Sequence, residues 1–192
     1  MEFYTLHVCG LERKLPVIQV ADALSIASFV ILGDTELVEE AAKKLKDKLP
    51  EVDVLITAEA KGIPLIFELS RICGMKQYIV ARKSIKPYMV SPLVTEVYSI
   101  TTQKKQILCL DETEAAAIKG KRVAIIDDVI STGESLKAME ALVKKAGGHI
   151  AAKAAILAEG SAADREDIIY LEKLPVFPVR KRTPNVDKGD IV

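Results

Sequence analysis

The segment that decides both the fold and the candidate site is Val123-Ala124-Ile125-Ile126-Asp127-Asp128-Val129-Ile130-Ser131-Thr132-Gly133-Glu134-Ser135. Its apolar residues predict a buried strand, two adjacent carboxylates stand at the carboxyl end of that strand, and a hydroxyl-rich turn then opens a helix. Such a turn attracts an anion, because backbone N–H groups and the helix dipole point at it and a glycine lets the backbone come close. The segment therefore predicts a phosphate site.

The two carboxylates of Asp127 and Asp128 narrow the kind of ligand. They would repel a phosphate beside them unless they face hydroxyl groups or a divalent cation, so a sugar phosphate bound with Mg²⁺ suits the pair. The same residue types are common in ordinary turns and helix caps, which leaves a purely structural role open. The segment is not a Walker loop, because the Gly-x-x-x-x-Gly-Lys pattern is missing.

Outward from this segment, apolar runs of strand length alternate with longer amphipathic segments. This alternation predicts the α/β class, with a mainly parallel sheet flanked by helices. Between 82 and 110 the regularity fails, and two weak strand-like runs predict a hairpin in a long excursion, a place where lids over sites often lie. We expect strands at 52–56, 77–81, 121–126 and 150–158, helices at 34–50, 63–73 and 135–146, and hairpin strands at 94–100 and 107–110.

The composition limits the classes of partner. The 192 residues fit one domain over 1–192, and no linker divides them. Lys+Arg 27 against Asp+Glu 27 leaves no surplus of cations, so we expect no nucleic acid polymer and no membrane surface as partner. The three cysteines form no Cys-x-x-Cys pair, and the first residues lack a secretion signal. A cytoplasmic location is the expectation.

Two further segments carry features of anion sites. Residues 57–62, Thr-Ala-Glu-Ala-Lys-Gly, follow an expected strand and precede an expected helix, which repeats the geometry of an anion-binding turn. Residues 81–87, Ala-Arg-Lys-Ser-Ile-Lys-Pro, concentrate three cations at the exit of another expected strand. Taken alone, the first segment could be a simple turn with a cap, and the second could be a solvated charged surface.

The segment 123–135 resembles the thirteen-residue 5-phosphoribosyl-1-pyrophosphate motif of the type I phosphoribosyltransferases, and the similarity extends over roughly 17–159. It is most similar to the purine branch, which holds adenine and xanthine phosphoribosyltransferases. The resemblance implies the fold of that family, with a flexible hairpin lid and a small hood. It also implies transfer of ribose 5-phosphate from the donor to a purine base in purine salvage, with Mg²⁺ bound mainly through the donor's pyrophosphate, in a homodimer.

The resemblance also implies a role for each site residue. Asp127 and Asp128 would hold the ribose hydroxyls as the catalytic pair. Lys61 stands where the adenine-type loop has arginine, which keeps the charge but loses the bidentate fork. The ribose and its 5-phosphate would be bound by Asp127, Asp128, Val129, Ile130, Ser131, Thr132, Gly133, Glu134 and Ser135, of which Ser131 through Ser135 would cradle the phosphate. The pyrophosphate would meet Glu59, Ala60, Lys61, Gly62, Arg82, Lys83 and Lys86.

The identity of the base is the least determined part. Tyr98, Ser99 and Thr101 would belong to the lid, and Thr101 fills the position where the adenine enzyme has a glutamate. Glu159 could accept a hydrogen bond from an exocyclic amine, which favours adenine slightly over xanthine or hypoxanthine, although it could equally be a surface residue. Because that loop glutamate is missing, a regulator that senses the donor without catalysis is an alternative. Transfer to an acceptor other than a purine is another.

Overall fold

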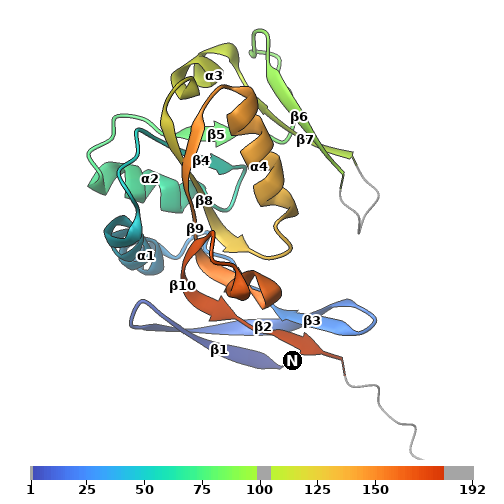
Figure 1. Ribbon diagram of the computed structural model, residues 1–192. Helices are drawn as coiled ribbons and strands as arrows, with labels where there is room; N and C mark the ends of the chain where they lie inside the picture. Colours follow the sequence, from blue (N-terminus) through green and yellow to red (C-terminus); the bar gives the residue numbers. More distant parts are fainter. Residues whose placement is uncertain (1, 99–104, 180–192) are drawn as a thin grey trace, which may run out of the picture.

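The computed structural model describes residues 2–98 and 105–179 and is centred on a five-stranded parallel sheet (Figure 1). The strands lie in the order β10-β9-β8-β4-β5, and each neighbouring pair is parallel. Their bounds are β4 Val54–Ala58, β5 Ile79–Ala81, β8 Arg122–Ile130, β9 His149–Glu159 and β10 Ile169–Leu174. The expected α/β class with a mainly parallel sheet is confirmed.

Helices cover both faces of this sheet, so the central parts of its strands are largely apolar (Figure 1). Alternate residues of β8 divide between two cores: Ala124 and Ile126 pack on the side of α1 and α2, while Val123 and Ile125 pack on the side of α3 and α4. The helices are α1 Thr35–Lys48, α2 Ile63–Ile72, α3 Glu112–Ile118 and α4 Glu134–Lys145, and a 3₁₀ turn, η1 Gly160–Asp164, follows β9.

A second sheet is antiparallel, in the order β1-β2-β3-β11. The rings of Tyr4 in β1 and Phe177 in β11 lie 5.8 Å apart, although these strands form the two edges, so the sheet is strongly curled. It corresponds to the small hood that the resemblance implies. Its strands are β1 Phe3–Val8, β2 Leu11–Ala21, β3 Leu24–Ala27 and β11 Val176–Pro178.

The excursion between β5 and α3 contains the expected hairpin, with β6 Leu93–Tyr98 antiparallel to β7 Lys105–Leu110. Two backbone hydrogen bonds of 2.9 Å between Arg82 and Cys109 join β7 to the exit of β5. Nζ of Lys145 in α4 donates to the carbonyl oxygen of Val94 at 2.8 Å. The hairpin is therefore attached to both the sheet and the helix that frame the site.

The structure corrects three expectations. Residues 112–118 form α3, which the sequence analysis did not predict. Strand β8 runs on to Ile130 instead of ending at 126, because its pairing with β9 continues to Ile130 and Ala158. Strands β1, β2, β3, β10 and β11 were likewise not predicted. Among the described residues, no helix is long and apolar enough to cross a membrane.

Candidate active site

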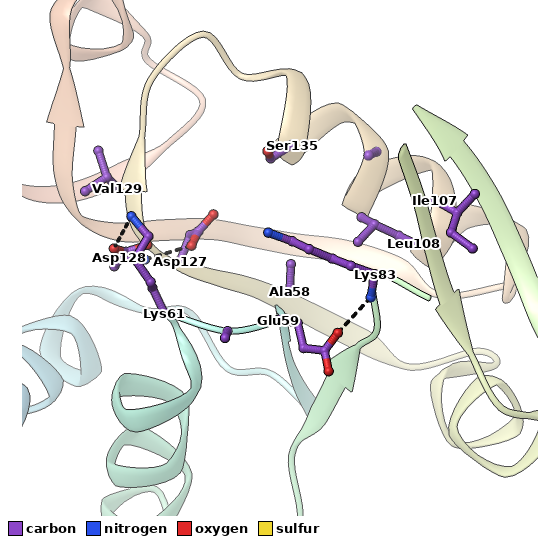
Figure 2. Close-up of a pocket in the computed structure, with 12 residues that line it drawn as sticks. Ala58, Glu59, Lys61, Lys83, Ile107, Leu108, Asp127, Asp128, Val129 and Ser135 are labelled. Atoms are coloured by element: carbon purple, nitrogen blue, oxygen red, sulfur yellow. Dashed lines mark hydrogen bonds and ion pairs between the residues drawn. The ribbon is translucent and has the colours of Figure 1, made fainter. Parts of the chain in front are cut away.

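A cavity of about 390 Å³ lies at the carboxyl ends of β4 and β8, the end of a parallel sheet where ligands usually bind. Helix α4 and strand β7 complete its wall. Side chains from four separate segments of the sequence therefore meet there (Figure 2). The lining residues are Ala58, Glu59, Ala60, Lys61, Lys83, Ile107, Leu108, Asp127, Asp128, Val129, Ser135 and Ala138.

The two adjacent carboxylates of β8 differ in their surroundings. Asp128 is 3% exposed, and its Oδ2 has no hydrogen-bond partner among the described residues. The ammonium of Lys61, itself half-exposed, lies 3.4 Å from that oxygen. A buried carboxylate oxygen that lies near one ammonium but accepts no hydrogen bond can accept one from a hydroxyl group of a ligand.

Asp127 is partly buried and holds a proton more tightly than an ordinary aspartic acid. Burial raises the pKa of its carboxyl group, and the charge and hydrogen bond of the adjacent Asp128 raise it further. The Oδ1 atom of Asp127 accepts a hydrogen bond of 2.9 Å from the backbone N–H of Asp128. Two ionised carboxylates so close together repel each other, and hydroxyl donors or a cation would stabilise their charged form.

Residues 131–135, which we call the anion turn, join β8 to α4 and line a smaller cavity of about 100 Å³. Gly133 has a φ of 80°, a left-handed conformation that favours glycine, and no side chain caps the helix from that position. The positive end of α4 therefore faces the cavity without a capping carboxylate. Its lining residues are Asp127, Val129, Ile130, Ser131, Thr132, Gly133, Ser135 and Leu136.

The loop at 59–62 lies against β8. A Cβ on Gly62 would be 2.2 Å from Oγ1 of Thr57 and 3.6 Å from Cα of Asp127, so only glycine lets this loop approach the carboxylates so closely. The peptide between Glu59 and Ala60 is cis. The backbone N–H of Glu59 donates to the carbonyl oxygen of Ala81 at 2.9 Å, which fixes the loop to β5.

Of the three cations in the basic residues 82–86, Lys83 reaches the larger cavity, which Lys61 also lines. The backbone N–H of Lys83 donates a 2.9 Å hydrogen bond to Oε2 of Glu59. The side chain of Lys83 stretches across the cavity towards Asp127 (Figure 2). Arg82 is partly buried: burial lowers the pKa of its guanidinium, but the hydrogen bond with Tyr88 raises it above its ordinary value. Nζ of Lys86 donates to Oγ of Ser84 at 2.7 Å. Neither Arg82 nor Lys86 lines the two cavities described above.

The remaining expected residues lie outside the cavities or outside the described chain. Oε2 of Glu159, at the end of β9, accepts a 2.7 Å hydrogen bond from Oγ of Ser131, so this carboxylate supports the anion turn. Glu134 lies in the first turn of α4. The lid residues Ser99 and Thr101, and the side chain of Tyr98, fall outside the described part of the structure.

The sequence analysis missed the apolar wall formed by Ile107, Leu108 and Ala138. Ile107 and Leu108 were read only as hairpin residues and Ala138 only as part of a helix. The single sequence signal was that Ile107 and Leu108 lie within the excursion, whereas nothing singled out Ala138. An apolar wall beside charged loops suits a ligand with one aromatic or sugar face and one anionic end.

The described residues contain no group of three or more His, Cys, Asp or Glu side chains that could hold a metal ion. The carboxylates that line the larger cavity are those of Asp127, Asp128 and Glu59, and the carboxylate of Glu59 accepts a hydrogen bond from the backbone of Lys83. Mg²⁺ is commonly bound by one or two carboxylates together with phosphate oxygens of a substrate. The site fits a cation that arrives with its ligand.

Comparisons with known proteins agree with this geometry. Residues 33–179 match the model of the phosphoribosyl transferase domain family. The chain is 37% identical over 127 residues to the hypoxanthine/guanine phosphoribosyltransferase of Methanocaldococcus sp. (strain FS406-22), a match that covers 65% of this chain and 61% of the relative. It is 33% identical over 148 residues to the adenine phosphoribosyltransferase of Thermosipho africanus, covering 75% of this chain and 82% of the relative.

A solved structure supports the fold. The crystal structure of adenine phosphoribosyltransferase from Thermoanaerobacter pseudethanolicus superimposes with a TM-score of 0.67, at 22% identity, over 83% of this chain and 95% of that chain. The family model covers most of the chain and includes the anion turn, the loop at 59–62 and the basic residues 82–86. The chain belongs to the phosphoribosyl transferase domain family.

Proposed function

We propose that this protein is a purine phosphoribosyltransferase that uses 5-phosphoribosyl-1-pyrophosphate as donor. The observation that carries the proposal is the buried Asp128 oxygen that lacks a hydrogen-bond partner, between an anion turn on one side and the lysines of the loop at 59–62 and the basic run on the other. A ribose with a phosphate at each end matches this order of carboxylate and cationic groups.

In the proposed reaction, a ring nitrogen of the base forms a bond to C1 of the ribose as the bond from C1 to the pyrophosphate oxygen breaks. The pyrophosphate leaves with the electron pair, and the ring nitrogen loses its proton. Asp127 and Asp128 would bind the ribose hydroxyls and stabilise positive charge on the ribosyl ring. Lys61 and Lys83 would stabilise the negative charge that develops on the departing pyrophosphate.

Mg²⁺ is part of this proposal. Asp127 and Asp128 would hold it together with the hydroxyl and pyrophosphate oxygens of the donor, since the described residues supply no complete metal site of their own. Bound there, the cation neutralises charge on the leaving pyrophosphate. The carboxylates of this chain then orient the ribose.

Adenine is the acceptor that we propose first, with xanthine or hypoxanthine as the alternative. The support for adenine is that a carboxylate can accept a hydrogen bond from an exocyclic amine. Oε2 of Glu159 accepts a hydrogen bond from Ser131, and we propose that Oε1 accepts one from the amine. The relatives named above include both a hypoxanthine/guanine and an adenine enzyme. An activity assay with each purine therefore has to identify the acceptor base.

The test is to incubate the protein with donor, Mg²⁺ and each purine in turn, and to measure the pyrophosphate released. We expect release with at least one purine, and adenine to be the most active. Asp128→Asn should lower the rate at least about a hundredfold, because it removes a buried charge from the reacting ring. Asp47→Asn is the matched control, since Asp47 is exposed in α1, and it should leave the rate unchanged.

The absence of turnover with every purine and pyrimidine base would contradict the proposed enzymatic activity. Calorimetry on the same sample separates the alternatives, because tight donor binding without turnover would identify a sensor of the donor.

We also propose that the protein works in the cytoplasm as a homodimer. Light scattering should then give about twice the chain mass of 20.9 kDa.

A further inference from the structure

Arg165 lies against the anion turn but comes from a different part of the fold. Its Nη1 atom is 2.7 Å from the point where a Cβ on Gly133 would be. Arg165 directly follows η1, the short turn after β9, whereas Gly133 opens α4. A guanidinium from one segment thus touches the backbone of the turn that would hold a phosphate.

The guanidinium is held in one orientation by Asp167. Nε of Arg165 donates to Oδ1 of Asp167 at 2.8 Å, and Nη2 donates to Oδ2 at 2.7 Å. This two-point contact fixes the plane of the group and leaves Nη1 as the nitrogen that faces Gly133. The side chain is 28% exposed, so most of it is shielded from water.

Asp167 is in turn held by Lys153 of β9, which also pairs with Glu140 of α4 at 3.1 Å. Lys144 lies 3.8 Å from Glu140 and completes the group. The network contains three cations (Lys144, Lys153 and Arg165) and two carboxylates (Glu140 and Asp167), which leaves a surplus of one positive charge. The cation of this network that contacts the anion turn is Arg165.

We propose that Arg165 is a positioning residue for the phosphate end of the sugar phosphate, acting through the anion turn. Its charge adds to that of the α4 N-terminus, and its contact with Gly133 supports the left-handed turn. This inference rests on the proposed function, because it assumes that the anion turn binds the 5-phosphate. Arg165 then affects only the phosphate end of the ligand, through the anion turn, and leaves the pyrophosphate end to other residues.

The test compares two ligands that occupy opposite ends of the site. Binding of ribose 5-phosphate and of magnesium pyrophosphate is measured by calorimetry for the wild type and for Arg165→Gln. We expect the variant to bind ribose 5-phosphate about tenfold more weakly, because the anion turn loses both the nearby charge and the contact at Gly133. Pyrophosphate should bind as in the wild type. In turnover, KM for the donor should rise while kcat changes little, because the 5-phosphate is remote from the bond that breaks.

Arg122→Gln is the matched control. Arg122 makes the same two-point contact with Asp53, but it starts β8 at the opposite end of the sheet. It should leave the binding of both ligands unchanged. Arg165→Lys, which keeps the charge without the fork, should recover part of the ribose 5-phosphate affinity, an effect that a merely structural role would not give.

The inference is overturned if Arg165→Gln binds ribose 5-phosphate as the wild type does, or if both ligands weaken equally. A wild type that binds pyrophosphate but not ribose 5-phosphate, or neither ligand, would contradict the proposed function itself. The two failures are therefore distinguishable on the same samples. A thermal melt of each variant checks that the fold is retained.

Discussion

Gly62 shows how the site constrains a single residue. Its φ is −70°, which any residue adopts, so the requirement for glycine comes from space alone. The missing Cβ would collide with Oγ1 of Thr57, a fully buried side chain beneath the loop. The sequence correctly indicates a turn at this position, but it cannot show which neighbour the glycine touches, because Thr57 lies five residues away on β4.

This contact predicts a coupled pair of substitutions. Gly62→Ala should lower the free energy of unfolding by about 1–3 kcal/mol, as expected when a packed contact is overfilled. Adding Thr57→Ala removes the colliding oxygen, so the double variant should lose less than the sum of the two single changes. Urea unfolding of the four proteins measures this coupling. Strictly additive losses would show that the loop avoids the collision by moving.

Helix α3 is one of the elements that the sequence analysis missed, although its start carries a clear signal. Oδ1 of Asp111 accepts a 2.8 Å hydrogen bond from the backbone N–H of Glu114, and Oε2 of Glu114 accepts a 3.1 Å hydrogen bond from the N–H of Asp111. This reciprocal pair is a capping box, and Asp-x-x-Glu was visible in the sequence. The helix has only seven residues, too few to show a helical repeat of apolar positions.

The capping box predicts a local loss of stability. Asp111→Ala leaves the N–H of Glu114 without its partner and should lower the free energy of unfolding by about 1 kcal/mol. Glu112→Ala, in the same turn but outside the box, should stay within about 0.5 kcal/mol of the wild type. Denaturant unfolding checks both. Equal effects of the two substitutions would contradict a specific role of the box.

Whether the other helices and strands could be predicted depends on how regularly their apolar residues repeat. Helix α1 was predictable because Asp34 caps it and its buried residues, from Leu37 to Leu45, recur at helical spacing. Strand β2 was not, since Pro16 interrupts its alternation, although its pairing with β1 is a local hairpin in which Val8 lies opposite Leu11. The anion turn, the loop at 59–62 and Lys83 were predictable as local motifs. The positions of Arg82 and Lys86 depend on tertiary contacts, and the assigned roles of all these residues stay predictions.

At the scale of the whole molecule, a formal charge of zero is the sum of paired and unpaired regions. Away from the site, ion pairs join parts that are distant in sequence, such as Arg13 of β2 with Asp34 before α1, at 2.6 Å. Arg122 similarly joins the amino ends of β4 and β8 through Asp53. Near the larger cavity, the buried oxygen of Asp128 accepts no hydrogen bond from the described residues, although Lys61 lies 3.4 Å away. Zero net charge therefore conceals a cavity where two cations, Lys61 and Lys83, lie beside carboxylates, so that a ligand with both hydroxyl and anionic groups can bind.

The Arg122 contact predicts how stability depends on pH. Hydrogen bonds from the guanidinium and the backbone N–H of Arg122 hold the pKa of Asp53 well below its ordinary 3.8. The folded state therefore binds this proton less tightly than the unfolded state, so the stabilisation is present above pH 3.8 and is lost as the pH falls below it. Asp53→Asn should be less stable than the wild type at pH 7, and the difference should shrink at pH 3.

Urea midpoints of both proteins at the two pH values measure the effect. Asp47→Asn, an exposed change on α1, should match the wild type at both. An unchanged difference between pH 7 and pH 3 would contradict the pairing as its cause. The ligand affinities should stay the same, because Asp53 lies at the end of the sheet opposite the site.

The close approach of Gly62 to β8, together with the two hydrogen bonds that Glu59 makes around β5, has a consequence for the thermodynamics of binding. Three segments that are far apart in sequence are already in place before any ligand arrives. Ordering a residue costs about 1–2 kcal/mol in conformational entropy, and here folding meets that cost in advance. The free energy of the contacts between these loops and a ligand is then not spent on assembling the site, and it can contribute to discrimination between ligands.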